Sequence, residues 1–431
     1  MKFHSTRGDA RAVTLSEAIT AGLAADGGLY VPDDLPHVDA GEFAAGATLP
    51  AIAARLLAPF FAGDALAPEL RAICSEAITF PAPLRSMATP RDHVLELFHG
   101  PTAAFKDFGA RFLAASMRRI PRDTSTPLTI LVATSGDTGA AVGAAFSGVP
   151  GFRVVILYPD GRVSPRQAHQ LGCFGGNVTA LRVGGSFDDC QRMVKQAFAD
   201  TELRDRAPLS SANSISLGRL LPQMAYYAHC ALDHWRRRQT LLNFVVPTGN
   251  LGNAFAGALG RACGLPIGQI VLACNANRVL PEFFAGADYA PQSSVATLAN
   301  AMDVGAPSNF ERLRWLYPKV AVLRQEFRAF SVGDDEIRAT IRGRYERYGE
   351  IFCPHTATAI HALESLRRAG EDGDWAAVAT AHPAKFDSVI EPLIGRAVEV
   401  PEALAALLAR PAHAEPLAAT YAALRSRLLA N

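Results

Sequence analysis

The sequence predicts an α/β protein with parallel sheet, preceded by an N-terminal helical unit. Short, continuously apolar runs alternate with longer helical stretches through most of the chain, which is typical of parallel strands that helices cover on both faces. The length of 431 residues suits two or three packed units. With 49% apolar and 19% charged residues, the composition is that of a globular protein.

The N-terminal unit is predicted over about residues 14–78, where the pattern is helical and rich in Ala and Leu. The run DGGLYVPDDLP, at residues 26–36, interrupts this pattern with an ordered loop, because Gly and Pro break helices and set turns. Three prolines, Pro81, Pro83 and Pro90, mark the boundary with the rest of the chain.

Strands and helices alternate beyond that boundary. Strands are predicted at residues 94–98, 128–134, 153–159, 178–183, 241–247, 269–274 and 375–380. Helices are predicted between them, among others at residues 103–119, 136–147, 187–199 and 217–238. In such sheets ligands bind beyond the carboxyl ends of the strands, so we expect functional residues in the strand-to-helix loops.

Lysine is scarce in this chain. Of the 42 basic residues, five are lysines: Lys2, Lys106, Lys195, Lys319 and Lys385. Arginine stays protonated at every relevant pH, so any chemistry that needs a neutral side-chain amine depends on one of these five.

Lys106 stands early in a predicted helix between Phe105 and Phe108. These apolar neighbours predict partial burial, which lowers the pKa of an amine toward the nucleophilic neutral form. Such an amine can form a Schiff base with an aldehyde. The alternative is a lysine that pairs with Asp107 or another nearby carboxylate.

Two loops with Gly and short polar side chains follow predicted strands. PTGNLGN, at residues 247–253, lacks the Lys-Ser/Thr of a nucleotide-binding loop, so it suits the phosphate of a monoester held by backbone N–H groups at a helix start. ATSGDTGAA places Ser135, Asp137 and Thr138 at a strand end, which favours ligand contact. Plain turns with helix capping are the alternative for both loops. An aspartic protease would need a second Asp-Thr/Ser-Gly, which the chain lacks.

Two further segments carry candidate residues. NSISLGR places Asn213, Ser214 and Arg219 at a helix start, where donors and a guanidinium suit a second anion. The alternative is a capped helix with a surface arginine. Thr380 stands at the end of the last predicted strand, where a lone Thr is most often structural.

Several protein classes are disfavoured. The formal net charge of +1 provides no excess of positive charge that would attract nucleic acid or an anionic membrane. No run reaches the roughly eighteen apolar residues of a membrane helix, and the first residues lack the apolar segment of a secretory signal. The seven cysteines show no CxxC and are expected to be reduced core residues. Without HExxH or GxSxG, we expect no metal site and no hydrolase nucleophile, and we expect a cytoplasmic protein.

Seven motifs, in order along the chain, resemble the threonine synthases of the bacterial and fungal long form, which are fold-type II pyridoxal-phosphate enzymes. They are STRG…GLAADGGLYVP, PTAAFKD, ATSGDTGAA, NSISLGR, PTGNLGN, CPHTATA and TAHPAKF. The resemblance implies a fold like that of the tryptophan synthase β subunit, with two lobes that contain parallel sheet. It implies an N-terminal unit at 1–85, a large cofactor-binding lobe at 86–119 and 226–431, and a smaller mobile lobe at 120–225.

The resemblance also implies roles for individual residues. Lys106 would hold pyridoxal 5′-phosphate through a Schiff base and later act as a general base. The cofactor phosphate would be held by Gly249, Asn250, Leu251, Gly252 and Asn253, while Ser135 and Asp137 would line the ring edge and Thr380 would hydrogen-bond the pyridine nitrogen. Ser214 and Arg219, with Asn213 and Thr138 nearby, would bind the substrate phosphate. Ser216 stands where the family often has Asn.

The reaction implied is the conversion of O-phospho-L-homoserine and water to L-threonine and phosphate, the last step of threonine biosynthesis. It combines γ-elimination with β-addition of water and is carried out by a carbon–oxygen lyase that acts on phosphate. The resemblance further implies a monomer with a small-molecule substrate. Two alternatives stay open: a threonine/serine dehydratase of the same fold, which would lack the second phosphate site, and a non-catalytic relative, which would be expected to lose Lys106.

Overall fold

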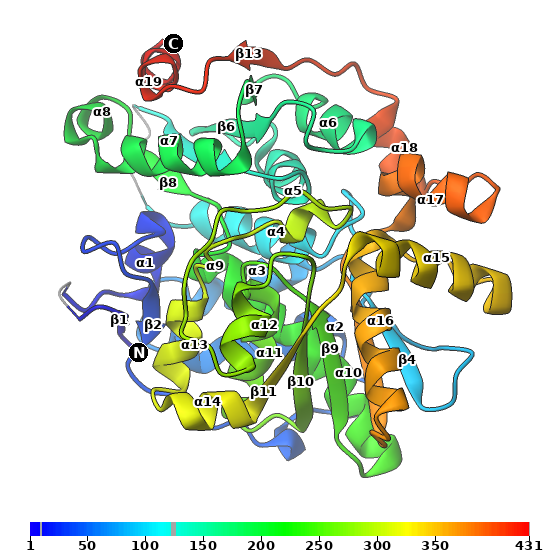
Figure 1. Cartoon of the computed structure of the whole chain (residues 1–431). Coiled ribbons are helices and arrows are strands. Elements are labelled where there is room, and N and C mark those ends of the chain that lie inside the picture. The colour runs from blue at the N-terminus through cyan, green and yellow to red at the C-terminus, as the bar shows by residue number, and fades with distance from the viewer. Residues whose placement is uncertain (9–10, 122–125, 431) are drawn as a thin grey trace.

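The structure is a computed structural model that describes residues 1–8, 11–121 and 126–430. Two sheets organise the chain (Figure 1), with β9, β10 and β11 in the lower half of the view and β6, β7 and β13 in the upper half. The predicted α/β class with parallel sheet and an N-terminal unit is confirmed.

The first sheet has six strands in the order β11-β10-β9-β12-β4-β3. Their bounds are β3 (Leu84–Ser86), β4 (Asp92–Glu96), β9 (Leu242–Pro247), β10 (Ile267–Cys274), β11 (Phe327–Ser331) and β12 (Asp374–Ala379). All pairs are parallel except β3 with β4. The sheet therefore brings segments from both ends of the chain together, and the carboxyl ends of β4, β9 and β12 lie along one edge.

The second sheet has five strands in the order β13-β7-β6-β5-β8, all parallel. Their bounds are β5 (Leu128–Ala133), β6 (Phe152–Pro159), β7 (Val178–Val183), β8 (Leu209–Ser211) and β13 (Glu415–Leu417). Every residue of β5 is buried. Ile130 and Val132 belong to one apolar cluster, whereas Leu131 and Ala133 belong to another, so both faces of this sheet are covered, as its continuously apolar strands predict.

The N-terminal unit consists of a small antiparallel pair and three helices: β1 (Phe3–Ser5), β2 (Tyr30–Pro32), α1 (Leu15–Ala21), α2 (Leu49–Leu57) and α3 (Leu70–Ala77). Thr14 and Glu17 form a capping box at the start of α1. Figure 1 shows α1 and the β1–β2 pair at the left of the view, below α7 and α8.

Helices cover both sheets. Around the second sheet lie α5 (Asp137–Phe146), α6 (Pro165–Gly172), α7 (Phe187–Ala199), α8 (Thr201–Arg206) and α19 (Tyr421–Leu429). The others are α4 (Lys106–Met117), α9 (Leu217–Leu220), α10 (Met224–Arg238), α11 (Gly252–Ala262), α12 (Val279–Phe284), α13 (Phe310–Leu316), α14 (Val320–Glu326), α15 (Asp334–Tyr348), α16 (Pro354–Arg368), α17 (Asp387–Ile394) and α18 (Glu402–Leu408). Short 3₁₀ turns also occur, among them η6 (Pro383–Phe386), which follows β12.

The predicted strands all occur within a few residues of their expected bounds. The helix predicted at 217–238 is divided, because the turn Leu221–Gln223 separates α9 from α10 and Pro222 falls within it. The C-terminal segment was expected in the large lobe as part of 226–431. Instead, β13 pairs with β7, and Leu424 and Leu428 of α19 pack against α7 in the second sheet's layer.

No helix in the described part of the chain combines the length and the apolar character needed to cross a bilayer. All seven cysteines are buried and free, as expected of reduced core residues.

Candidate active site

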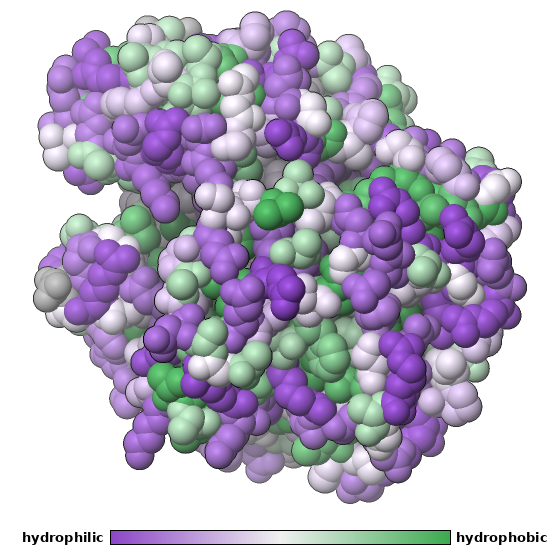
Figure 2. Space-filling model, viewed as in Figure 1, coloured by the Kyte–Doolittle hydropathy of each residue, from purple (hydrophilic) through white to green (hydrophobic). Residues whose placement is uncertain are grey.

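A cavity of about 1320 Å³ opens between the second sheet, the N-terminal unit and the loops that follow strands of the first sheet. Figure 2 shows the surface hollowed between the part formed by α7 and α8 and the part formed by α1 and β1. Among the predicted site residues, the cavity is lined by Lys106, Ser135, Thr138, Asn213, Ser214 and Asn250. The other seven do not line it: Asp137, Arg219, Gly249, Leu251, Gly252, Asn253 and Thr380. All of these except Gly249 are buried.

Lys106 is the first residue of α4 and is half-buried on the cavity wall. Its Nζ lies 4.3 Å from the centroid of the Phe105 ring. Burial and the Arg219 guanidinium lower the pKa of Lys106 to about 7, against the opposing effect of the Asp137 carboxylate. The predicted lowering of the pKa of this amine is therefore confirmed.

Asp107 does not pair with Lys106. Its carboxylate accepts hydrogen bonds from the N–H of Thr102 (2.9 Å) and the Thr102 hydroxyl (2.7 Å). Within the described residues Lys106 Nζ has no hydrogen bond or ion pair, so the alternative of a carboxylate-paired lysine is wrong. A half-neutral amine on a cavity wall is a competent nucleophile and proton carrier.

The glycine loop follows β9 and begins α11, as predicted. Leu251 adopts a left-handed conformation with φ of 63° at the N-cap of α11, and a Cβ on Gly249 would lie 2.7 Å from the carbonyl oxygen of Met302. In the part of the chain that the structure describes, the N–H groups of residues 249–253 meet no acceptor. Free N–H groups at the start of an eleven-residue helix suit an anion such as a phosphate.

Side chains connect this loop to its neighbours. The Asn250 side-chain amide donates to the hydroxyl of Ser214, and its Oδ1 accepts from the N–H of Ser308 at 2.5 Å. Asn309 Nδ2 donates to the carbonyl oxygen of Asn250 at 3.0 Å. The Asn253 carboxamide instead points into the core, where its Oδ1 accepts from the Tyr226 hydroxyl at 2.6 Å. Asn253 Nδ2 is buried and has no hydrogen-bond partner among the described residues.

The loop after β5 has an unexpected capping arrangement. Thr134 Oγ1 accepts from the N–H of Gly136 and of Gly139, both at 3.0 Å. Gly136, with φ of 131°, makes the turn into α5. Because Thr134 does the capping, Ser135 and Thr138 are free to line the cavity, and the capping alternative does not explain them.

Arg219 is fully buried rather than a surface arginine. Its Nη1 donates to the carbonyl oxygen of Ala212 at 2.5 Å, while Nε and Nη2 have no partner among the described residues. Burial lowers the pKa of Arg219 to about 10, so the group stays charged at neutral pH. Helix α9 has four residues, so the guanidinium, and not the helix, supplies the positive charge expected here.

Asp137 is the first residue of α5, after the short loop that follows β5, and Thr380 directly follows β12. Asp137 Oδ1 lies 2.7 Å from Lys385 Nζ and accepts from Gln167 Nε2 at 2.9 Å. The Thr380 carbonyl oxygen accepts from the N–H of Phe105 at 2.8 Å, which places Thr380 beside the turn that carries Lys106.

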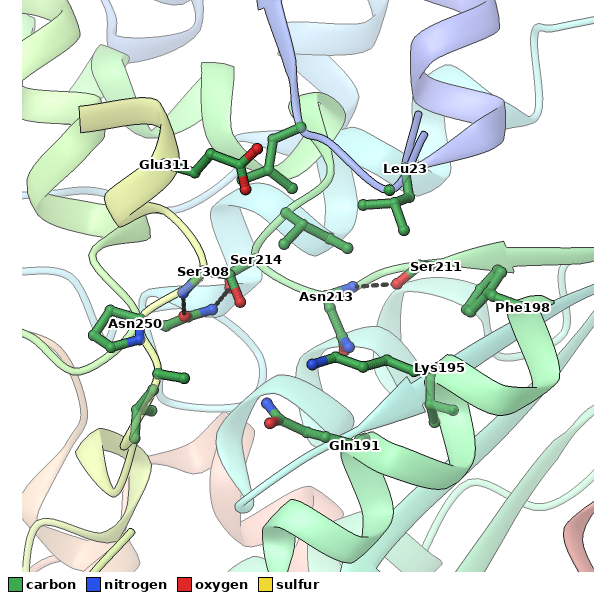
Figure 3. Close-up of a pocket in the computed structure, with 18 of the residues that line it drawn as sticks. Leu23, Gln191, Lys195, Phe198, Ser211, Asn213, Ser214, Asn250, Ser308 and Glu311 are labelled. Carbon is green, nitrogen blue, oxygen red and sulfur yellow. Dashed lines mark hydrogen bonds between the residues drawn. The ribbon is translucent and has the colours of Figure 1, made fainter. Parts of the chain in front are cut away.

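Some lining residues were not predicted. Figure 3 shows Gln191, Lys195 and Phe198, on one face of α7, with Gln191 and Lys195 extending toward Asn213. Arg7 and Glu311, whose Nε and Oε1 are 3.2 Å apart, line the cavity from the N-terminal unit and α13. The scarcity of lysine singled out Lys195 and Lys385, but it gave no sign of where their side chains lie.

Comparison with known proteins identifies the family. Residues 94–384 match the model of the pyridoxal-phosphate dependent enzymes, residues 2–78 the threonine synthase N terminus, and residues 356–427 the threonine synthase C-terminal region. The threonine synthases of Serratia marcescens and Escherichia coli (strain K12) are each 38% identical to this chain, over 100% of it and 99% of their own length.

Solved structures agree with the sequence comparisons. The crystal structure of Escherichia coli threonine synthase matches with a TM-score of 0.93 at 37% identity, over 100% of this chain and 99% of that one. The PLP-bound threonine synthase from Brucella melitensis matches with a TM-score of 0.89 at 35% identity, with the same coverage. The chain belongs to the threonine synthase family of pyridoxal-phosphate-dependent enzymes.

Proposed function

We propose that this chain uses pyridoxal 5′-phosphate to convert O-phospho-L-homoserine and water into L-threonine and phosphate. The observation that carries the proposal is the combination of one low-pKa amine, Lys106, with two separate places for an anion. One is the row of free N–H groups at residues 249–253, and the other is the buried, partly unpartnered Arg219 guanidinium. A phosphorylated cofactor and a phosphorylated substrate require two such places, whereas a dehydratase requires one.

The residues present fit the cofactor. Lys106 would hold its aldehyde, and the N–H groups of residues 249–253 would hold its phosphate, as their lack of acceptors supports. Ser135, Asp137 and Thr380 remain our predicted neighbours of its ring. When bound, the cofactor supplies an electron sink for the charge left on a substrate carbon that loses a proton.

The chain's own side chains supply binding and proton transfer. With a pKa of about 7, the Lys106 amine can take a proton from the substrate Cα and return protons later in the reaction. Arg219 and Ser214, with Asn213 and Thr138, bind the substrate phosphate in our proposal, so that it leaves from Cγ toward a positive charge. Closure of the lobe at 120–225 would keep water out until phosphate has left.

Product analysis tests the proposal. Purified protein given O-phospho-L-homoserine should release threonine and phosphate in equal amounts, and Lys106→Ala should release neither. Release of an oxoacid from threonine or serine, with no action on phosphohomoserine, would instead establish the dehydratase alternative. Borohydride reduction and peptide mapping should place the pyridoxyl group on Lys106, and a label on another lysine would contradict the assigned role.

We extend the proposal to a monomer that acts in the cytoplasm without nucleic acid. The balanced charge and the seven buried, free cysteines support this extension. Light scattering after gel filtration should give the mass of one chain, and a dimer mass would contradict it.

A further inference from the structure

Lys385 is a second buried lysine that the proposed reaction does not use. It lies in η6 with 0% exposure of its side chain. Burying an ammonium is costly unless a partner compensates for the lost hydration. Lys385 has two such partners: the carboxylate of Asp137, at 2.7 Å, and the carbonyl oxygen of Thr102, at 2.9 Å.

These two partners belong to different parts of the molecule. Asp137 begins α5, after the short loop that follows β5 of the second sheet, and Gln167 of α6 also donates to it. Thr102 belongs to the turn before α4, and its N–H and hydroxyl hold the carboxylate of Asp107, the neighbour of Lys106. The Lys385 ammonium therefore joins the second sheet's layer to the turn that carries Lys106.

Five titratable groups lie on the elements that meet at this junction: Arg219 on α9, Asp137 on α5, His355 on α16, Asp107 on α4 and Lys385 on η6. Of the charged side chains among them, Arg219 and Asp137 shift the pKa of Lys106. Of these, Asp137 opposes the lowering of the Lys106 pKa that burial and Arg219 produce. Asp137 can do so only while it is ionised. Burial alone would raise the pKa of Asp137. Lys385, together with His355 and the hydrogen bond from Gln167, more than offsets this effect, so the pKa of Asp137 is lowered.

We infer that Lys385 is a positioning residue for Lys106, because its ammonium keeps the Asp137 carboxylate charged and fixed against the turn that carries Lys106. Lys385 acts through Asp137 and Thr102 and contacts no reacting atom. Without Lys385, Asp137 takes up a proton, its charge disappears from the surroundings of Lys106, and the Lys106 amine becomes a weaker base. This inference rests on the proposed role of Lys106.

The test measures the Lys106 amine directly in the full-length chain after hydroxylamine has removed the cofactor. Trace reductive methylation between pH 5 and 10, with mass spectrometry of the Lys106 peptide, gives its apparent pKa. The exposed Lys2 and Lys319 are internal references. Because the measurement needs no turnover, a missing threonine synthase activity and a wrong role for Lys385 give different results.

We expect Lys385→Met and Asp137→Asn each to lower the apparent pKa of Lys106 by about 1 pH unit. The double variant should lower the pKa of Lys106 no further, because both substitutions remove the same negative charge, that of Asp137. Arg166→Met is the matched control. Arg166 forms the neighbouring ion pair with Asp387, 3.1 Å between Nε and Oδ2, and donates to the carbonyl oxygen of Ala384, so this variant should leave the pKa unchanged.

Three outcomes would overturn the inference: an unchanged pKa in Lys385→Met, additive shifts in the double variant, or an equal shift in Arg166→Met. If Lys385→Met fails to fold because the Asp137 carboxylate is left without a cationic partner, the double variant, which removes both members of the ion pair, is compared with the parent. A pKa equal to that of the parent would then overturn the inference, and a pKa lower by about 1 pH unit would support it.

Discussion

The side-chain amide of Asn250 donates to the hydroxyl of Ser214, which joins the loop after β9 to the turn before α9. The two proposed anion sites, one in each segment, therefore share a hydrogen bond. A movement of Asn250 or Ser214 when an anion binds at one site therefore changes the geometry of the other site.

Asn250→Ala should weaken cofactor binding by about tenfold, since it removes the bonds to Ser214 and to the N–H of Ser308. Fluorescence titration with pyridoxal 5′-phosphate measures the effect. Asn243→Ala is the control at the other end of β9. It loses two comparable bonds, to Asp374 and Gln269, and should reduce stability while leaving cofactor affinity intact. Equal losses of affinity in both variants would contradict this reading of the loop.

Arg219→Met should raise the KM for phosphohomoserine and abolish inhibition by inorganic phosphate. The apolar side chain fills the buried space but removes the two unpartnered guanidinium nitrogens. Steady-state kinetics with added phosphate provides the measurement. Arg111→Met is the matched control, because Arg111 donates to the carbonyl oxygens of Ala77 and Glu76 away from the cavity. Retained phosphate inhibition in Arg219→Met would assign the substrate phosphate to other residues.

Gly109→Ala should destabilise the protein by about 1–3 kcal/mol. A Cβ at Gly109 would lie 2.6 Å from the backbone carbonyl oxygen of Arg219, so α4 and α9 would have to separate. Gly343→Ala is the control within α15, where the new Cβ would meet only the flexible end of Arg347 at 3.3 Å. That variant should gain up to about 1 kcal/mol from helix propensity. Urea unfolding measures the free energy of unfolding of both variants. Equal values would show that α4 and α9 can move apart at little cost in free energy.

The stability of the cofactor-free protein should rise with pH above 7. The pKa of Lys106 falls from an ordinary 10.5 in the unfolded chain to about 7 in the folded one. Between these values the unfolded chain binds the extra proton, so raising the pH favours folding. The free energy of unfolding of the parent, relative to Lys106→Met, should therefore increase from pH 7 to pH 9. A flat difference for Lys106→Met would mean that Lys106 keeps its proton when folded.

The elements that could be predicted from the sequence are those with a strong local signal. The buried strand β5 is a nearly continuous apolar run. The apolar neighbours Phe105 and Phe108 likewise predict that Lys106 is partly buried. Three-residue strands such as β8 and β13 carry too little pattern to stand out, and they form because a neighbouring strand offers its open edge.

The missed parts of the site depend on contacts between distant segments. Nothing local distinguishes a buried Arg219 from a surface arginine, since its environment comes from α4 and the turn at Ala212. The Lys385–Asp137 ion pair joins residues that are 248 positions apart in the chain. The pair forms only because tertiary packing brings η6 against α6, in the layer of the second sheet.

The return of β13 to the second sheet bears on how the protein is made. That sheet begins to form once β5 and β6 have been synthesised, but β7 keeps an unpaired edge until residues 415–417 leave the ribosome. An open, parallel edge strand invites pairing with other chains. The nascent enzyme therefore exposes an unpaired strand edge from the synthesis of β7 until that of β13. A chain truncated before β13 would keep this edge and be prone to aggregate.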